Sequence, residues 1–464
     1  MSSVMYTARK TLKNLANGGN ALMVATVLAL LVVNIPIFHD WYENLWNNEV
    51  RLQLGSFNLF SHLGHPMSLG AFVNDALMAI FFFSVGLEIK REVLVGELSS
   101  FRKALLPIIG ACGGMIVPVV IYYLLAKETP YEAGMAIPMA TDIAFSLGVL
   151  SMLGKRVPIG LKIFLTTLAV VDDIGGILVI AIFYTSQINY WMLIAAAVIL
   201  CILIAGGAWL KIQSKMFYLL FGCAVWFLFL NAGIHPTIAG VLIAFTIPAK
   251  PVYAPQGFIK NIRENISHFS KEDEVALESR TILSHQQMDW LKQIESASDK
   301  VISPLQDLED TLNPLVNYFI LPLFAFANAG IYFGDMAPKD VVSGVSLAII
   351  CGLVLGKFLG ILSFSWVAIK AKVAPMPKGG NWKRMASISM LGGIGFTVSL
   401  FIAGLSFKTP EQVLMLNEAK LGILSGSIIA GILGYLMLRM TLPKEDQDQG
   451  EDAAEEIAVP NEEL

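Results

Sequence analysis

The stretch LTTLAVVDDIGGILVIAIFY, residues 165–184, is as apolar as a membrane span, yet two adjacent carboxylates, Asp172 and Asp173, lie in its middle. A charge at the centre of a bilayer costs about 2.5–3.5 kcal/mol on insertion scales. Adjacent helix positions point about 100° apart, so one neighbouring group cannot easily serve both side chains. One interpretation is a structural pair held by polar groups of neighbouring helices. The other is a pair that faces a water-filled cavity and binds either a proton or a small hard cation.

The whole chain has the composition of a membrane protein. Its 464 residues are 55% hydrophobic and only 15% charged, which is too apolar for a soluble protein of this length. Apolar runs of about 18 or more residues are long enough to cross a hydrocarbon core of about 30 Å. We predict twelve spans, or eleven if the seventh and eighth are one, at residues 18–37, 67–89, 104–126, 132–152, 158–184, 190–210, 215–231, 233–249, 314–333, 341–369, 385–406 and 418–438.

The distribution of Lys and Arg predicts the orientation of these spans. If the N-terminus is cytoplasmic, most basic residues fall in cytoplasmic loops, as the positive-inside rule requires. Both termini are then expected inside. The basic residues are dispersed at segment ends, which gives no sign of nucleic-acid binding. Membrane lipid is therefore the expected environment of the chain.

Segments outside the spans complete the predicted organisation. Residues 48–60, NEVRLQLGSFNLF, alternate polar and apolar around Gly-Ser, which predicts a short periplasmic β-hairpin. Helical spacing of apolar residues predicts a cytoplasmic helix near 271–297. The acidic tail, which lacks aromatic residues, is expected to be disordered. The predicted parts are a cytoplasmic N-terminus (1–17), spans 1–8 (18–249), a partly helical cytoplasmic loop (250–309), spans 9–12 (310–440) and the tail (441–464).

Two spans are interrupted at similar depth. The fourth, GMAIPMATDIAFSLGVL, contains Pro138 and the polar pair Thr141 and Asp142. The eleventh, MLGGIGFTVSLFIAG, contains three closely spaced glycines. A kinked helix with Asp142 as the cap of its second half accounts for the fourth span. Free backbone ends in a membrane are tolerated only inside protein or along a cavity, and two interrupted spans in corresponding halves are typical of secondary transporters with inverted repeats.

Other charges lie inside or beside the spans. Asp142 could neutralise the positive N-terminal ends of broken helices. Lys357, in LVLGKFLGIL, could neutralise the negative C-terminal ends, pair with one aspartate, or extend to an interface. Asp75 is a further intramembrane acid in the second span, whose inner end carries Glu88 and Arg91. That charged end could also be no more than a solvated helix terminus.

With these residues in place, the chain resembles the NhaA family of sodium/proton antiporters. The resemblance runs from about residue 18 to residue 439, outside the loop at 250–305. It rests on NDALMAIFFFSVGLEIKRE, AIPMATDIAFSLGVL, LKIFLTTLAVVDDIGGILVIAIFY, LPLFAFANAG, GKFLGI, GGIGFTVSLFIA and AKLGILSGS. It implies an all-α polytopic membrane protein with twelve transmembrane helices, inverted repeats, and interrupted helices 4 and 11. It also implies pH-regulated, electrogenic export of Na⁺ or Li⁺ against protons across the bacterial inner membrane, with no cofactor.

The resemblance also assigns roles to residues. It implies that Asp172, Asp173 and Thr141 bind the cation and the protons, and that Asp142 and Lys357 compensate the helix-break charges. It implies pH regulation by a set that consists of Glu88, Arg91, Glu309 and His235, the last in NAGIHPTIAG. The predicted hairpin resembles one that joins two protomers, so a homodimer is expected.

The chain departs from the family pattern before the ninth span. There it reads DLEDTLNPLVNY, with Asp310 and Asn313 where the best-known members have histidines. The departure concerns the pH set point and not the exchange. Two other functions fit the composition: an intramembrane aspartyl protease, which needs two aspartates on different helices, and a passive cation channel, which needs neither a buried lysine nor a titrating pair. Both fit the motifs less well than a transporter, so we predict no catalytic residues.

Overall fold

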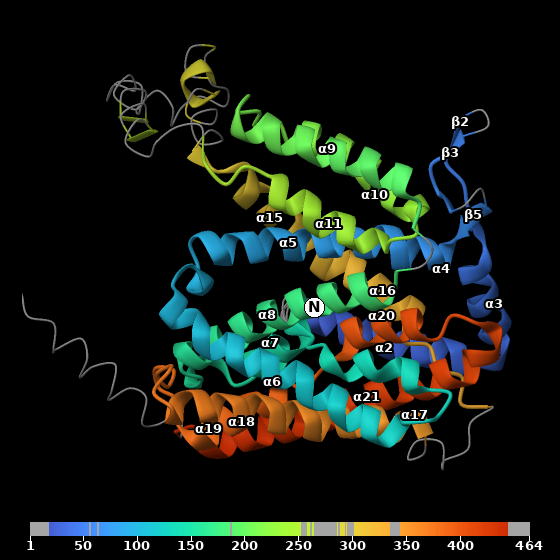
Figure 1. Ribbon diagram of the computed structural model, residues 1–464, viewed down its shortest axis with the longest axis vertical. Coiled ribbons are helices and arrows are strands. Elements are labelled where there is room, and N and C mark those ends of the chain that lie inside the picture. Colours follow the sequence, from blue (N-terminus) through green and yellow to red (C-terminus); the bar gives the residue numbers. More distant parts are fainter. Residues whose placement is uncertain are drawn as a thin grey trace, which may run out of the picture.

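The computed structural model describes residues 18–54, 57–62, 65–185, 188–251, 301–334 and 344–443, with a few isolated residues between 258 and 294. Most helices lie side by side, and the labelled strands gather at one end of the molecule near α3 (Pro36–Asn47) and α4 (Leu69–Ala71) (Figure 1). The predicted N-terminus (1–17) falls outside the described residues, and so does the predicted tail (441–464) after residue 443; Thr441 is the last residue of α21 (Val413–Thr441). Most of the predicted helix near 271–297 also falls outside them, and residues 285, 288–292 and 294 of it are helical.

The first half of the chain is a succession of apolar helices. Proline and glycine mark several of their ends, as at Pro36 and Pro236, where a missing N–H is tolerated in the first turn. Further helices of this half are α2 (Gly18–Asn34), α5 (Met78–Leu94), α6 (Phe101–Ala126), α7 (Ile143–Ser151), α8 (Ile159–Phe183), α9 (Tyr190–Ala208), α10 (Lys215–Ala232) and α11 (Pro236–Thr246), with short 3₁₀ turns at Glu97–Ser99, Glu132–Met139 and Gly154–Arg156.

The second half has the same character. Two π-helical turns, a feature that is frequent at functional sites, lie between its helices. The helices are α15 (Pro304–Leu315), α16 (Leu321–Asn328), α17 (Gly344–Ile350), α18 (Lys357–Lys370), α19 (Trp382–Leu391), α20 (Phe396–Ser406) and α21 (Val413–Thr441), and the π turns are η5 (Val316–Ile320) and η7 (Cys351–Gly356), with a third, η1 (Phe72–Leu77), before α5 and a 3₁₀ turn at Pro410–Gln412.

Length and apolar composition identify the helices that can cross a membrane. Among the described residues, 8 helical stretches qualify, or up to 10 if each of two bent pairs is one span. The chain is thus an integral, multi-pass protein, and every predicted span contains helix. Residues 233–249 do not qualify, because α11 has only 11 residues. Residues 314–333, which α15, η5 and α16 share, are not among the qualifying stretches either.

The first span ends earlier than predicted. Helix α2 stops at Asn34, and α3 leaves it at an angle of 114°. Pro36 causes the break, because proline disfavours helical backbone at the residue before it. The amide of Asn34 secures the turn: its Nδ2 donates to the carbonyl of Ile331 at 2.7 Å, and its Oδ1 accepts from the N–H of Phe333 at 2.8 Å.

The strands extend beyond the predicted hairpin. Strands β2 (Gln53–Leu54) and β3 (Phe57–Asn58) form a hairpin inside 48–60, but β1 (Glu49–Val50) pairs with β5 (His65–Ser68), which also pairs with β4 (Ser61–His62). The prediction that the second span begins at 67 is therefore wrong by two residues. Its helix starts at Leu69, where the Ser68 hydroxyl caps it by accepting from Ala71 N–H at 3.1 Å.

Two hydrophobic cores divide the bundle, and α5 lies between them (Figure 1). Phe82 of α5 belongs to the larger core, with Phe164 of α8 and Phe401 of α20. Phe83, the next residue, belongs to the smaller core, which α9, α10, α11 and α15 supply. Successive helix positions point about 100° apart, so one helix can serve both cores. Charged residues on α5 therefore lie at the seam between them.

Candidate functional site

The two interrupted helices meet at their breaks. The fourth span is a 3₁₀ helix to Met139, an extended segment through Asp142, and then α7, so the break follows Pro138 rather than lying at it. The eleventh bends by 45° between α19 and α20. Backbone hydrogen bonds join the breaks: Asp142 N–H donates to the carbonyl of Ile394 at 2.7 Å. Each break thus satisfies polar groups that the other leaves free.

Asp142 lies at two helix N-termini at once. Its Oδ1 accepts from the N–H of Phe145, in the first turn of α7, at 2.9 Å. Its Oδ2 accepts from the N–H and the hydroxyl of Thr397, in the first turn of α20, at 3.1 and 2.6 Å. The carboxylate is only 2% exposed. A negative charge here offsets the positive ends of both half-helices.

Lys357 pairs with the first of the two adjacent aspartates. Its Nζ lies 2.5 Å from Asp172 Oδ2 and donates to Thr141 Oγ1 at 2.9 Å. The hydroxyl of Thr141 in turn donates to the carbonyl of Gly392 at 2.9 Å. Lys357 is 0% exposed and Asp172 1%. The sequence left three positions open for Lys357, and the structure pairs it with one aspartate. A buried ion pair of this kind is stable only because each charge compensates the other.

Asp173 faces a cavity, whereas Asp172 faces the ammonium group of Lys357. Asp173 lines a space of about 330 Å³, here called the aspartate cavity, together with Thr141 and Asp142. Residues of α5, α7, α15, η5, α16 and α20 form the rest of the wall, including Ser84, Glu88, Arg91, Glu309, Asn317 and Thr397. A buried carboxylate beside hydroxyl and amide oxygens can hold a proton or a small hard cation, which prefers oxygen ligands. The two aspartates therefore differ: one is paired and the other is available.

A charged cluster borders the aspartate cavity. Arg91 Nε lies 3.0 Å from Glu309 Oε1, and Nη2 of the same guanidinium forms a second ion pair with Glu92 Oε1 at 3.3 Å. Glu88, one helical turn before Arg91, lines the same cavity. Burial raises the pKa of the Glu309 carboxyl above its ordinary value, and the neighbouring Arg91 guanidinium opposes that rise. Asn313 also lines the cavity, whereas Asp310 is exposed.

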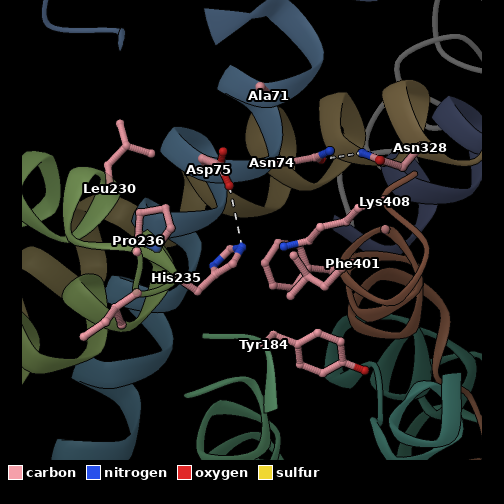
Figure 2. A pocket seen from close by; sticks show the side chains of 14 residues that line it. Ala71, Asn74, Asp75, Tyr184, Leu230, His235, Pro236, Asn328, Phe401 and Lys408 are labelled. Atoms are coloured by element: carbon pink, nitrogen blue, oxygen red, sulfur yellow. Dashed lines mark hydrogen bonds and ion pairs between the residues drawn. The ribbon is translucent and has the colours of Figure 1, made fainter. Parts of the chain in front are cut away.

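His235 lies apart from the other residues assigned to pH regulation. It lines a second space, of about 410 Å³, here called the histidine cavity. Figure 2 shows its ring pointing toward Asp75, whose Oδ1 is 3.6 Å from Nε2, while Nδ1 lies 2.8 Å from the hydroxyl of Thr237. Gly233, at φ 82°, makes the turn that presents this histidine between α10 and α11. The two residues of the sequence analysis that had no partner, Asp75 and His235, thus meet.

Aromatic rings separate the two cavities. Phe401 contacts His235 and Phe324 edge-on, at 5.2 and 6.3 Å between ring centroids. It also contacts Phe82 in a tilted arrangement at 5.7 Å. Phe401 lines the histidine cavity, and Thr397, one turn earlier on α20, lines the aspartate cavity. The cavities share no lining residue. One helix therefore contacts both, with an apolar layer between them.

Several polar residues of these cavities escaped the sequence analysis, and three of them bear on the site. Thr397 bonds Asp142, Asn317 lines the aspartate cavity, and Lys408 lines the histidine cavity. Thr397 follows the glycines of the eleventh span directly, and a polar residue at that point was an available signal. Asn317 and Lys408 had no such signal, because an asparagine near a helix start and a lysine after a span are ordinary. Within the described residues, no group of three or more His, Cys, Asp or Glu side chains could hold a metal ion.

Comparisons with known proteins identify the family of the chain. The family model described as Na⁺/H⁺ antiporter 1 matches residues 9–438. A protein of Phocaeicola vulgatus named Na⁺/H⁺ antiporter NhaA is 56% identical over 92% of this chain and 94% of its own length. Proteins of the same name from Bacteroides fragilis and Bacteroides thetaiotaomicron are 55% and 52% identical, over 91% and 94% of this chain and 95% and 99% of theirs. The resemblance seen in the motifs is confirmed, and the chain belongs to the NhaA family of Na⁺/H⁺ antiporters.

Proposed function

We propose that this protein exchanges cytoplasmic Na⁺ or Li⁺ for external protons, with Asp172 and Asp173 as the exchange site. The observation that carries the proposal is the contrast within the pair: Asp173 lines a cavity, while Asp172 is bound to the buried Lys357. Family membership supports the activity. The homologues are transporters rather than enzymes, and the ions that they exchange are the proposed substrates of this protein.

Two protons are released for each cation on this mechanism. Asp173 gives up one proton when Na⁺ enters the aspartate cavity. The second proton is the one that Lys357 shares with Asp172. The buried amine stays an ammonium group only while it donates to the Asp172 carboxylate. When the cation takes Asp172 as a ligand, Lys357 loses its partner in a buried position and releases a proton. Two protons leave the site when one cation enters it. The cation-bound site therefore carries one positive charge less than the protonated site.

The membrane setting of the proposal follows from the sequence and the family. We propose twelve spans arranged as inverted repeats, with both termini in the cytoplasm of a bacterial cell and the chain in the inner membrane. In this orientation the aspartate cavity opens inward, since Glu88 and Arg91 precede a basic loop, and the histidine cavity opens outward. The strands at one end of the molecule (Figure 1) are then periplasmic, and they are the proposed contact of a homodimer.

Unequal stoichiometry predicts a response to membrane potential. In proteoliposomes, an imposed potential that is negative inside is expected to accelerate Na⁺ export several-fold, since each charge moved gains about 2.3 kcal/mol per 100 mV. The measurement is ²²Na⁺ efflux under potassium diffusion potentials of opposite sign, set with valinomycin. Efflux that is the same at both signs would establish neutral exchange and exclude the two-proton mechanism.

Glu309 is expected to contribute to pH dependence through its charge. Its carboxylate lies at the aspartate cavity and raises the local cation concentration. In Glu309→Gln, the half-saturating Na⁺ concentration should rise about twofold to fivefold at alkaline pH. Because the pKa of Glu309 is raised, the native charge disappears as pH falls through that value, so the native and variant curves should converge toward acid pH. Na⁺-driven proton movement measured over a pH series tests this.

Asp310→Asn is the matched control, because it removes the same charge from the next residue of α15 at an exposed position. Its effect should be smaller, since water and salt screen an exposed charge. A Glu309→Gln effect that is constant across pH would mean that the residue acts through packing and not through titration.

Two other functions are less consistent with the site. An aspartyl protease needs two aspartates that share a water, and Asp142 is the residue near Asp173 on another helix. Both oxygens of Asp142 are occupied by the first turns of α7 and α20. A passive channel would move cations without protons, so a potential that is negative inside would slow its ²²Na⁺ efflux, which is the opposite of the response expected for two-proton exchange.

A further inference from the structure

The histidine cavity contains a cationic side chain that the exchange mechanism does not use. Lys408 follows the end of α20, and Figure 2 shows its side chain extending beside Phe401 toward His235. Asp75 is on the opposite wall, in η1. Both groups act on the same space of about 410 Å³. The ammonium group therefore contributes to the electrostatic potential that a cation meets in this cavity.

The other polar groups of the cavity leave Asp75 as its cation-attracting charge. Asn74 and Asn328 satisfy each other, with Nδ2 of Asn328 donating to Oδ1 of Asn74 at 2.8 Å. The hydroxyl of Tyr184 is bonded to that of Ser406 at 2.8 Å. An intramembrane carboxylate in an aqueous cavity attracts sodium ions, and a lysine on the facing wall opposes that attraction. Lys408 thus brings the charge of this cavity close to neutral.

A nearly neutral outer cavity is useful to an exporter. An ion that passes the barrier of Phe82, Phe324 and Phe401 must leave the protein rather than remain bound beyond it. External sodium must also be kept from re-entering, and a fixed positive charge lowers its local concentration. Protons are affected less, since His235 and Asp75 can pass them between bonded groups and water. The charge would therefore act on one face of the protein only.

We propose that Lys408 is a specificity-determining residue of the histidine cavity. Its charge weakens the binding of sodium that arrives from outside, and it does not weaken the binding of sodium that arrives through the aspartate cavity. This inference rests on the proposed function and adds a direction to it. The residue is exposed at its helix end, so substitution leaves the packed core intact.

The test measures the half-saturating Na⁺ concentration separately on each face. Right-side-out and inside-out vesicles are prepared for the native protein, Lys408→Gln, Lys408→Glu and Lys408→Arg. Lys408→Gln should lower the outside value about threefold to tenfold, and Lys408→Glu further, as expected for a unit charge near a partly aqueous site. Lys408→Arg, which keeps the charge, should resemble the native protein, and the inside values should stay within the error of the assay.

Lys127→Gln is the matched control, because Lys127 directly follows α6, is exposed, and lies outside the lining of the cavity. It should leave both faces unchanged. The Lys408→Gln effect should also shrink as choline chloride raises the ionic strength from about 0.01 M to about 0.15 M, which shortens the Debye length from about 30 Å to about 8 Å.

The outcomes separate this inference from the function on which it rests. If the native protein exchanges Na⁺ for protons but Lys408→Gln leaves the outside value unchanged, or alters both faces equally, the role of Lys408 is overturned and the exchange stands. If the native protein shows no coupled movement of protons from either face, the proposed function itself fails.

Discussion

Replacing Asp173 with Asn is expected to abolish Na⁺-driven proton movement while the protein stays folded in the membrane. The side chain is 5% exposed and lines the aspartate cavity, so it is the carboxylate of the pair that an entering cation meets. An asparagine amide has nearly the same shape, but it neither carries a proton on and off nor offers a charged ligand. We expect residual exchange below about 1% of the native rate, a loss that corresponds to at least about 2.7 kcal/mol.

The experiment compares Asp173→Asn with Asp40→Asn, the same chemical change at an exposed position on α3. Proton release in everted vesicles is measured on adding Na⁺ or Li⁺, with protein amount checked by immunoblot and folding by detergent-solubilised size exclusion. Asp40→Asn should be normal. Asp172→Asn should also be inactive, since it removes the partner of Lys357. Normal exchange by a folded Asp173→Asn protein would rule out the proposed exchange site.

Replacing Lys357 with Met is expected to destabilise the protein and stop exchange. The ammonium group is 0% exposed and bonds both Asp172 and Thr141. Removing one partner of a buried pair costs about 3–5 kcal/mol, because the other charge is left uncompensated. The melting temperature in detergent, read by a thiol-reactive or tryptophan fluorescence assay, should fall well below that of the native protein. Lys370→Met, at the exposed end of the same helix α18, should change it little.

A double variant separates the structural contribution of the pair from its function. Replacing Lys357 with Met and Asp172 with Leu together removes both charges, and apolar residues of similar volume often restore or exceed the stability of a buried ion pair. The double variant should therefore regain most of the lost stability yet remain inactive. If Lys357→Met alone is as stable as the native protein, Lys357 and Asp172 are not a charged pair in which each charge depends on the other.

Several features of the site were predictable from local sequence. The apolar runs overlap every described helical stretch that is long and apolar enough to cross a membrane, because crossing a bilayer requires a length of apolar chain that few soluble segments have. Asp142 could be placed at a helix start, since Thr-Asp before an apolar run is a capping signal, and the structure has it accepting from Phe145 N–H. The adjacent aspartates were conspicuous because a charge in an apolar run is costly.

Local patterns could not predict which groups meet across the bundle. Lys357 had three possible positions by sequence, and only tertiary packing brings Thr141, at the break of the fourth span, and Asp172, on α8, to its amine. The turn at Pro36 was visible as a proline but not as a change of direction of 114°, which depends on Asn34 bonding residues almost 300 positions later. The last two residues of strand β5 were taken as part of a span, because the pairing of β5 with β1 is not local.

The sequence by itself determined that this chain is a membrane bundle with titratable groups at mid-depth, since hydropathy, capping and the cost of buried charge act along the chain. Tertiary structure alone decided that Asp172 is paired and Asp173 faces a cavity, although the two are neighbours on one helix. It also placed His235 and Lys408 in a separate cavity beyond Phe401. The physical reason is that a side chain's protonation and ligands depend on what the other helices bring to its face, and packing sets those contacts across hundreds of residues.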